Sequence, residues 1–172
     1  MVVDGEFYGH SKAATNLLIL QESIFSATSS HERKYTGFQL MESALKQAPD
    51  VDKLHLFTKN FIRVWINQLS KKDRYLHKAA LKLVCPDDPT IHCSCYADAV
   101  PFQASTVHGV VKESPSTGFP LVVRLLGPNG SRDFDRITNT KTVEVILGSI
   151  STAQLMEYVQ HLAGVFQDTT SK

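Results

Sequence analysis

Two aspartates, Asp133 and Asp135, flank a single phenylalanine in a polar part of the sequence. Closely spaced carboxylates can hold the divalent cations that assist phosphoryl transfer, but that chemistry also needs a rigid scaffold and a further charged partner. The preceding stretch, Gly127-Pro-Asn-Gly-Ser, predicts turns and lacks the Gly-Lys-Ser/Thr ending of a phosphate-binding loop. We therefore expect both aspartates to cap turns, and we predict no catalytic residue, no nucleotide cofactor and no enzyme activity.

A short segment of the sequence offers the thiolate and imidazole groups that zinc binds, at Cys85, His92, Cys93 and Cys95. Structural zinc sites favour cysteine pairs separated by about two to four residues. Cys93 and Cys95 are separated by a single serine, and no second pair follows them. We therefore expect reduced cysteines near a loop, with no metal site and no other cofactor.

Basic side chains recur along one side of the segment 71–84, most of which we expect to be helical, opposite its apolar side chains. The solvated face of an amphipathic helix explains such a pattern, and a phosphate-binding face is the alternative. A long polar loop over residues 127–140 adds further cations, and long ordered loops are often functional. Both segments together form our candidate surface for a protein or nucleic-acid partner. Its residues are Lys71, Arg74, Lys78, Lys82, Arg132, Arg136 and Lys141.

Phe57, Phe61 and Trp65 follow one another at four-residue steps, so a helix would place them on one face. Such a stripe can stack nucleobases, but helix-spaced aromatic residues usually belong to the hydrophobic core. His77 lies between the polar and apolar faces of the segment 71–84. We expect the aromatic stripe to be core and His77 to have a hydrogen-bonded packing role.

The composition of the 172-residue chain is globular, with 42% apolar and 20% charged residues. Its 18 Lys and Arg nearly balance 17 Asp and Glu, which gives a net charge of +1. Nucleic-acid-binding domains usually show a basic excess, so such a role must rest on a local patch or on other parts of a larger protein. With no long apolar run and no signal peptide, we expect an intracellular protein without a membrane partner or a small-molecule substrate.

Apolar residues recur at three- and four-residue steps through most of the chain, which predicts helices joined by polar breaks. Strands at 107–111 and 121–126 are the alternative, because both runs are rich in valine. Asp52 and Ser151 are suited to cap the helices that follow them, and Pro49 to end the helix before it. The expected helices span residues 11–25, 31–48, 52–69, 74–84, 98–113, 119–126, 140–148 and 152–166.

The last expected helix carries an apolar stripe that we expect to be buried, at Leu155, Tyr158, Val159, Leu162 and Phe166.

The expected helices are paired by short polar breaks. Such pairs cannot bury both faces alone, and stacking them gives an armadillo- or HEAT-like array. No internal repeat of fixed period is visible. The expected fold is therefore all-α, a degenerate helical-repeat array. It forms a single segment over 1–172, with its core at about 11–167 and a frayed tail at 168–172.

Three stretches of the sequence resemble one known family. They are Leu56-Phe-Thr-Lys-Asn-Phe-Ile-Arg-Val-Trp-Ile-Asn-Gln-Leu-Ser-Lys-Lys-Asp-Arg-Tyr-Leu-His-Lys-Ala-Ala-Leu-Lys, then Leu125-Leu-Gly-Pro-Asn-Gly-Ser-Arg-Asp-Phe-Asp, and more weakly Arg33-Lys-Tyr-Thr-Gly-Phe-Gln-Leu. The chain is similar, over most of residues 30–165, to the central part of the DNA polymerase phi/Myb-binding-protein family, which includes the fungal fifth DNA polymerase.

This resemblance implies a non-catalytic helical scaffold in the nucleus and nucleolus, acting in rRNA gene transcription and ribosome biogenesis. The partners it implies are nucleolar and pre-ribosomal proteins, with rDNA or rRNA as a further class. Two alternatives stay open. One is a direct DNA-binding protein, and the other is a DNA-directed DNA polymerase, as the family name suggests.

Overall fold

The computed structural model describes residues 19, 22–84, 107–113 and 115–170 of the chain. In this part all regular elements are helices and no strand occurs, so the expected all-α class is confirmed and the strand alternative is wrong. The elements are α2 (His31–Gln47), α3 (Asp50–Lys53), η1 (Leu54–Leu56), α4 (Lys59–Leu69), α5 (His77–Leu81), α6 (Val107–Glu113), η2 (Pro115–Thr117), α7 (Gly118–Leu126), α8 (Phe134–Thr138), α9 (Thr142–Ser149) and α10 (Thr152–Thr170).

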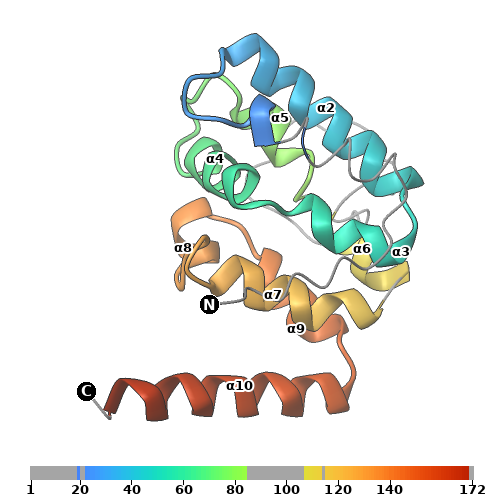
Figure 1. Cartoon of the computed structure of the whole chain (residues 1–172), viewed down its shortest axis with the longest axis vertical. Helices are drawn as coiled ribbons and strands as arrows, with labels where there is room; N and C mark the ends of the chain where they lie inside the picture. The colour runs from blue at the N-terminus through green and yellow to red at the C-terminus, as the bar shows by residue number, and fades with distance from the viewer. Residues whose placement is uncertain (1–18, 20–21, 85–106, 114, 171–172) are drawn as a thin grey trace, which may run out of the picture.

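The helices are stacked along the long axis of the molecule, from α2 and α5 at one end to α10 at the other (Figure 1). Helix α4 packs against α5 and α8, and α7 packs against α9 and α10. The armadillo- or HEAT-like repeat arrangement stays a prediction. None of the helices in the described ranges combines the length and the apolar character needed to cross a lipid bilayer.

Helix α2 has the extent that the sequence predicts, because both of its ends carry local signals. The Ser30 side chain accepts a hydrogen bond from the backbone N–H of Arg33 at 3.3 Å, which satisfies one of the unpaired donors of the first turn. The helix ends before Pro49, where Ala48 is already extended. At Gly37 a Cβ atom would lie 2.5 Å from Ile24, so the absent side chain allows the close approach of this segment.

The single helix expected over 52–69 is wrong, because the chain breaks at Phe57 and Thr58. Thr58 caps α4 by accepting a hydrogen bond from the Phe61 N–H at 3.3 Å. The guanidinium of Arg124, from α7, donates to the carbonyl oxygens of Leu54 at 2.9 Å and Phe57 at 3.4 Å. Burial lowers the pKa of Arg124, yet the group stays cationic at neutral pH. The Leu54 carbonyl also accepts the Phe57 N–H at 3.2 Å, whereas the Phe57 carbonyl loses the Phe61 N–H to Thr58 and accepts from Arg124 in its place.

Helices α4 and α5 form an antiparallel hairpin. The Trp65 Nε1–H donates to the Ala80 carbonyl at 2.9 Å, and the Gln68 side chain accepts from the Leu76 N–H at 3.3 Å. The Nδ1–H of His77 donates to the Gln68 carbonyl at 3.0 Å, which confirms its expected hydrogen-bonded packing role. These bonds hold residues 70–76 as turns, so α5 is shorter than the helix expected over 74–84.

The hydrophobic core is centred on aromatic side chains, as we expected for the stripe on α4. Phe61 and Trp65 are completely buried, with their rings stacked at a centroid distance of 5.4 Å. Edge and tilted ring contacts extend the cluster to neighbouring helices and the segment before α2. The further members of the cluster are Phe25, Phe38, Phe57 and Phe134.

Helix α10 begins as the sequence predicts, because the Ser151 hydroxyl accepts from the Gln154 N–H and the Gln154 side chain accepts from the Ser151 N–H. The expected burial of its apolar stripe is wrong for Leu155, Val159 and Leu162, which are 41%, 52% and 36% exposed. Tyr158, from the same stripe, is partly buried against the core, and it and His161 contact Phe119 of α7. The side chain of Phe166 lies outside the described ones. Helix α10 continues to Thr170, so residues 168–170 of the tail are helical, and the expected fraying of the tail stays a prediction.

Some expectations concern residues outside the described ranges. The four candidate zinc ligands, Cys85, His92, Cys93 and Cys95, all lie there, as does most of the helix expected over 11–25. Of the helix expected over 98–113, the described part is α6, Val107–Glu113, which is helical as predicted. No group of three or more potential metal ligands occurs among the side chains that are described.

Trp65 should contribute most to the stability of this core. Replacement by alanine should lower the free energy of unfolding by about 3–5 kcal/mol, because a large buried side chain leaves a cavity. Trp65→Phe should cost less, about 1–2 kcal/mol, through the lost hydrogen bond to Ala80 and the smaller ring. Urea denaturation followed by circular dichroism measures both. Equal costs for the two variants would contradict the role given to ring packing.

Candidate partner and nucleic-acid interface

Basic side chains are concentrated on the α4–α5 hairpin. Between Lys59 and Val84 the chain carries seven Lys and Arg residues against a single acidic residue, Asp73, although the whole chain is nearly neutral. All seven are exposed. We call them the basic hairpin set, and they are Lys59, Arg63, Lys71, Lys72, Arg74, Lys78 and Lys82.

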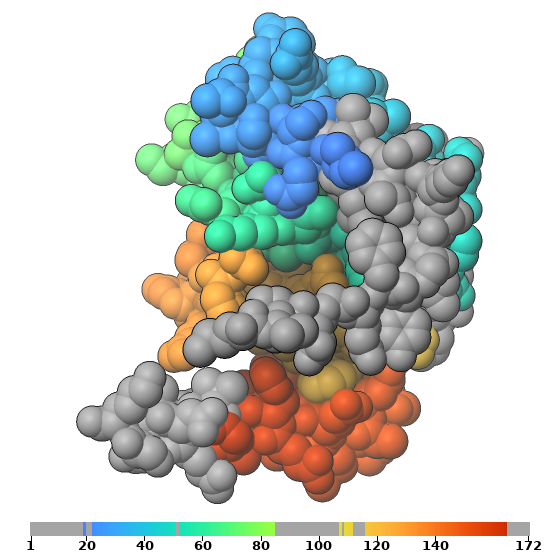
Figure 2. All heavy atoms as spheres, viewed as in Figure 1, coloured from blue at the N-terminus to red at the C-terminus, as the bar shows by residue number. Residues whose placement is uncertain are grey.

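The basic hairpin set has no ion-pair partner within the described part of the chain. Exposed cations that form no ion pair keep their charge available to an anionic ligand. In Figure 2 the light green atoms of the hairpin lie at the surface beside the blue atoms of α2. The hairpin is therefore a local basic surface on a chain whose net charge is close to zero.

The structure corrects how the predicted hairpin residues are placed. Lys71 and Arg74 precede α5, and Lys82 caps its C-terminus, so only Lys78 lies within the helix. The four cations therefore do not share one face of one helix. They follow the tip and the second arm of the hairpin, where the Arg74 N–H donates to the Lys71 carbonyl at 3.2 Å.

The predicted loop over 127–140 is not an irregular loop throughout, because it contains the helix α8. Helix α8 ends at Asn139, whose left-handed conformation (φ 53°) turns the chain sharply toward α9. Asparagine tolerates this conformation better than most residues. The Ser131 N–H donates to the Leu125 carbonyl at 2.8 Å, which closes the turn before α8.

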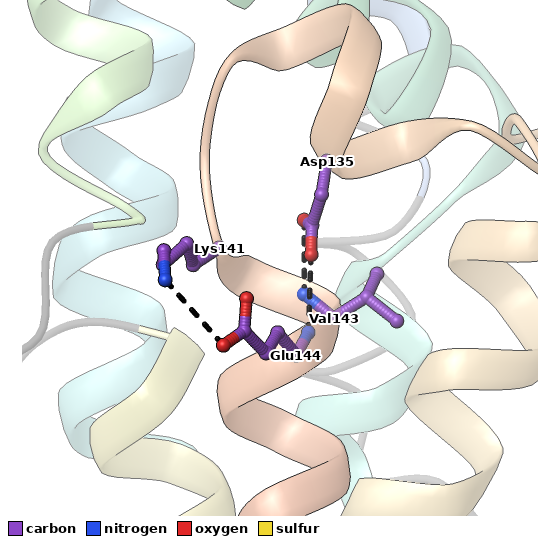
Figure 3. Close-up of polar contacts among 4 residues, drawn as sticks. All are labelled: Asp135, Lys141, Val143 and Glu144. Carbon is purple, nitrogen blue, oxygen red and sulfur yellow. Dashed lines mark hydrogen bonds and ion pairs between the residues drawn. The ribbon is translucent and has the colours of Figure 1, made fainter.

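The Asp135 carboxylate caps α9 (Figure 3). It accepts hydrogen bonds from the backbone N–H groups of Val143 and Glu144, each at 3.0 Å. Both of its oxygens are thus engaged at the first turn of a helix, where negative charge is stabilised. The expectation that Asp135 is a cap is confirmed.

Asp133 has a different partner from the one we expected. Its side chain makes no capping hydrogen bond, and it forms an exposed ion pair with Arg136 one helical turn away. The two aspartates therefore serve separate local contacts and do not form a shared carboxylate site. This arrangement does not provide the converging acidic groups that two-metal chemistry uses.

The three candidate cations around α8, Arg132, Arg136 and Lys141, differ in whether they form an ion pair. Lys141 forms an ion pair with Glu144 at 3.5 Å, and Arg136 is paired with Asp133. Arg132 is exposed and has no ion pair in the described part of the chain. Because Trp65 contacts both Ala80 and Phe134, α4 lies between the two candidate segments. Their joint use as one surface stays a prediction.

Four residues of the hairpin were missed by reasoning from helical faces. Lys59 and Arg63 lie on α4, and Lys72 and Tyr75 lie at the tip. Counting charge over the whole stretch 59–84 would have found the cations. Nothing in the sequence distinguishes Tyr75, which is 76% exposed, from the buried aromatic residues near it.

A comparison with protein families shows to which family the chain belongs. The family model described as DNA polymerase phi matches residues 19–86 and 98–172, which include both candidate segments. The chain belongs to the DNA polymerase phi family. The resemblance inferred from the three sequence stretches is therefore confirmed.

Two fungal members of the DNA polymerase phi family match the chain individually. The rDNA transcriptional regulator pol5 of Schizosaccharomyces pombe is 40% identical over 130 residues, which are 76% of this chain and 12% of the relative. The rDNA transcriptional regulator POL5 of Saccharomyces cerevisiae is 28% identical over 131 residues, 76% of this chain and 11% of the relative. The chain thus spans about a tenth of these relatives. No solved structure matches it.

Asp135 should matter for stability, and Asp133 should not. Asp135→Ala should lower the free energy of unfolding by about 1–2 kcal/mol, because two backbone donors of α9 lose their acceptor. Asp133→Ala, the matched control, removes an exposed ion pair worth only a few tenths of a kcal/mol. Thermal unfolding with and without Mg²⁺ measures both effects. A Mg²⁺-dependent stabilisation that disappears in both variants would instead support a metal site.

Proposed function

We propose that this chain is a non-catalytic helical scaffold of a nuclear regulator of rDNA transcription, and that its basic hairpin binds the phosphates of rDNA or rRNA. The observation that carries this proposal is the basic hairpin set, which is exposed and unpaired within the described residues. The relatives named as rDNA transcriptional regulators supply the nucleic acid concerned.

The charge distribution favours phosphate binding more than the net charge does. Phosphate contacts supply most of the affinity in nucleic-acid binding, and they require local cations, whatever the total charge of the chain. Helix α10 contains no Lys or Arg and carries Glu157 and Asp168, so the positive potential is concentrated away from this end. A polyanion should therefore approach the hairpin and avoid α10.

Three further features are proposed from the resemblance to the family: the location in the cell, the wider role and the repeat fold. We place the protein in the nucleolus, where rDNA is transcribed, with a role extending to ribosome biogenesis. Its stacked helices would form part of an armadillo- or HEAT-like array, a fold that offers extended binding surfaces. The engagement of Asp135 as a helix cap supports a non-catalytic role over the polymerase alternative.

A second function, binding a protein partner, is favoured by the open stripe on α10. Leu155, Met156, Val159 and Leu162 are all exposed, and adjacent exposed apolar residues of this kind mark contact sites. The occupant we propose is an amphipathic helix of a pre-ribosomal protein that carries Lys or Arg beside its apolar stripe. The absence of cations on α10 and the presence of Glu157 make such a helix complementary.

Nucleic-acid binding should depend on unpaired cations. Replacing Lys78 and Lys82 together by glutamine should reduce the slope of log affinity against log salt by about two, because each phosphate contact contributes about 0.9. Fluorescence anisotropy with a labelled rDNA or rRNA fragment, at several salt concentrations, measures the slope. The melting temperature should not change, because both side chains are exposed.

The matched control removes the same charge from engaged lysines on α2, outside both candidate segments. Lys34 donates to the Ser29 carbonyl at 2.8 Å and Lys46 is bonded to Glu42 at 3.4 Å, so replacing both by glutamine should leave the slope nearly unchanged. Equal effects of the two double variants would show that only net charge matters. An unaltered slope in both would refute the hairpin as the binding surface.

The protein-binding function makes a separate prediction for α10. Leu155→Glu with Val159→Glu should remove proteins that the tagged chain retains from nuclease-treated nuclear extract, because the apolar contact is lost. Gln160→Glu, an exposed polar position on the same helix, should retain them. Recovery of the same proteins by all variants would show that this stripe is not the protein-binding site. Both changes should leave the circular dichroism spectrum intact.

A further inference from the structure

Tyr75 is the most exposed large hydrophobic side chain in the described part of the chain, at 76% of its surface. It lies at the tip of the α4–α5 hairpin, between Arg74 and the buried Leu76. Burying a tyrosine ring stabilises a protein, so a ring left in solvent contributes almost nothing to the fold. The ring of Tyr75 is therefore free to contact a ligand at little cost to folding.

The backbone at Tyr75 is held in place on both sides. The next residue, Leu76, is buried, and its N–H is bonded to the Gln68 side chain. The His77 N–H donates to the Arg74 carbonyl at 3.0 Å. The tyrosine is thus presented on a fixed turn, which reduces the conformational entropy lost when it binds a ligand.

The ring of Tyr75 meets a second aromatic group from a distant part of the sequence. The imidazole of His31, at the start of α2, contacts it edge to face, with ring centroids 5.7 Å apart and planes at 89°. This perpendicular contact orients the phenol ring. His31 is itself exposed, so the pair forms a small aromatic platform at the surface.

Four cations lie close to Tyr75 in the sequence, with one carboxylate, Asp73, among them. Lys71, Lys72 and Arg74 precede Tyr75, and Lys78 follows it three residues later, in α5. All four belong to the basic hairpin set, which has no ion pair among the described residues. An exposed aromatic ring between cations is the combination that binds single-stranded nucleic acid, since bases stack on the ring and phosphates follow the charges.

We propose that Tyr75, oriented by His31, stacks on an unpaired base of a single-stranded nucleic acid whose phosphates contact the flanking cations. This inference rests on the proposed phosphate-binding function and names its ligand class. A base within a duplex has both faces covered by its neighbours, so Tyr75 can stack only on an unpaired base. Single-stranded RNA segments present such bases, and the hairpin is then a reader of unpaired RNA.

The test measures how tightly the 172-residue chain binds three labelled ligands of equal length, all with a phosphate backbone. They are a 20-nucleotide oligouridine, the same backbone with abasic sites, and a duplex. Three variants are compared with the natural sequence: Tyr75→Leu removes the ring, Tyr75→Phe keeps it, and Tyr35→Leu changes another exposed tyrosine, on α2, as the matched control. Circular dichroism and melting temperature establish that each variant is folded.

We expect the natural chain to bind oligouridine more tightly than the abasic strand or the duplex. Tyr75→Leu should weaken oligouridine binding about five- to one-hundredfold and bring it to the abasic level, because one stacked base is lost. Tyr75→Phe and Tyr35→Leu should bind as the natural chain does. The abasic strand should bind all variants equally, since only phosphates are available to it.

Other outcomes separate the two proposals. Equal, salt-dependent binding of oligouridine and the abasic strand, unaffected by Tyr75→Leu, would overturn base stacking and leave phosphate binding in place. If the natural chain binds none of the three ligands, both base stacking and phosphate binding are overturned. Displacement of oligouridine by polyglutamate at equal charge concentration, with no effect of Tyr75→Leu on either ligand, would mean that the hairpin binds acidic protein segments.

Discussion

The indole of Trp65 joins three helices, and the arrangement of the candidate surface depends on it. Its N–H donates to the Ala80 carbonyl of α5, its face stacks on Phe61 of its own helix, and its ring contacts Phe134 of α8 at 5.6 Å. A buried indole that keeps its hydrogen bond combines a large apolar surface with a fixed direction. The hairpin tip and the α8 segment are therefore positioned from a single buried residue.

This positioning explains how a nearly neutral chain presents a basic surface. Hydrogen bonds from Trp65 and to Gln68 hold α4 and α5 together, so that their apolar sides are buried and their cations remain exposed. The acidic residues near the second segment are occupied locally, Asp133 by Arg136 and Asp135 by the first turn of α9. Positive charge is therefore left unneutralised on the hairpin and largely neutralised around α8.

Local signals made several elements predictable. Ser30 and Pro49 delimit α2, and the Ser151–Gln154 capping box starts α10, so the sequence predicts where both begin. The break before α4 could not be predicted in this way, because the apolar stripe continues through Leu54, Phe57 and Phe61. It is stabilised by Arg124, which lies 67 residues after Phe57 in the chain.

The candidate site was predictable only in part, for a related reason. The identity of the cations is visible in the sequence, and so is their helical spacing. The shortening of α5 is not visible, because it follows from the tertiary hydrogen bonds of Gln68. The exposure of Tyr75 and of the α10 stripe is equally hidden, since periodicity identifies an apolar face without showing what covers it. Burial depends on neighbours that are distant in the sequence.

If the α4–α5 hairpin contacts nucleic acid, ultraviolet light should link it covalently to the bound strand. The 172-residue chain would be irradiated with transcripts and single strands from the rDNA unit, and the linked peptides identified by mass spectrometry. We expect cross-links within residues 59–82, concentrated at the hairpin tip and lost at high salt. Cross-links confined to other segments, or no more than a neutral control protein gives, would show that the hairpin is not the binding surface.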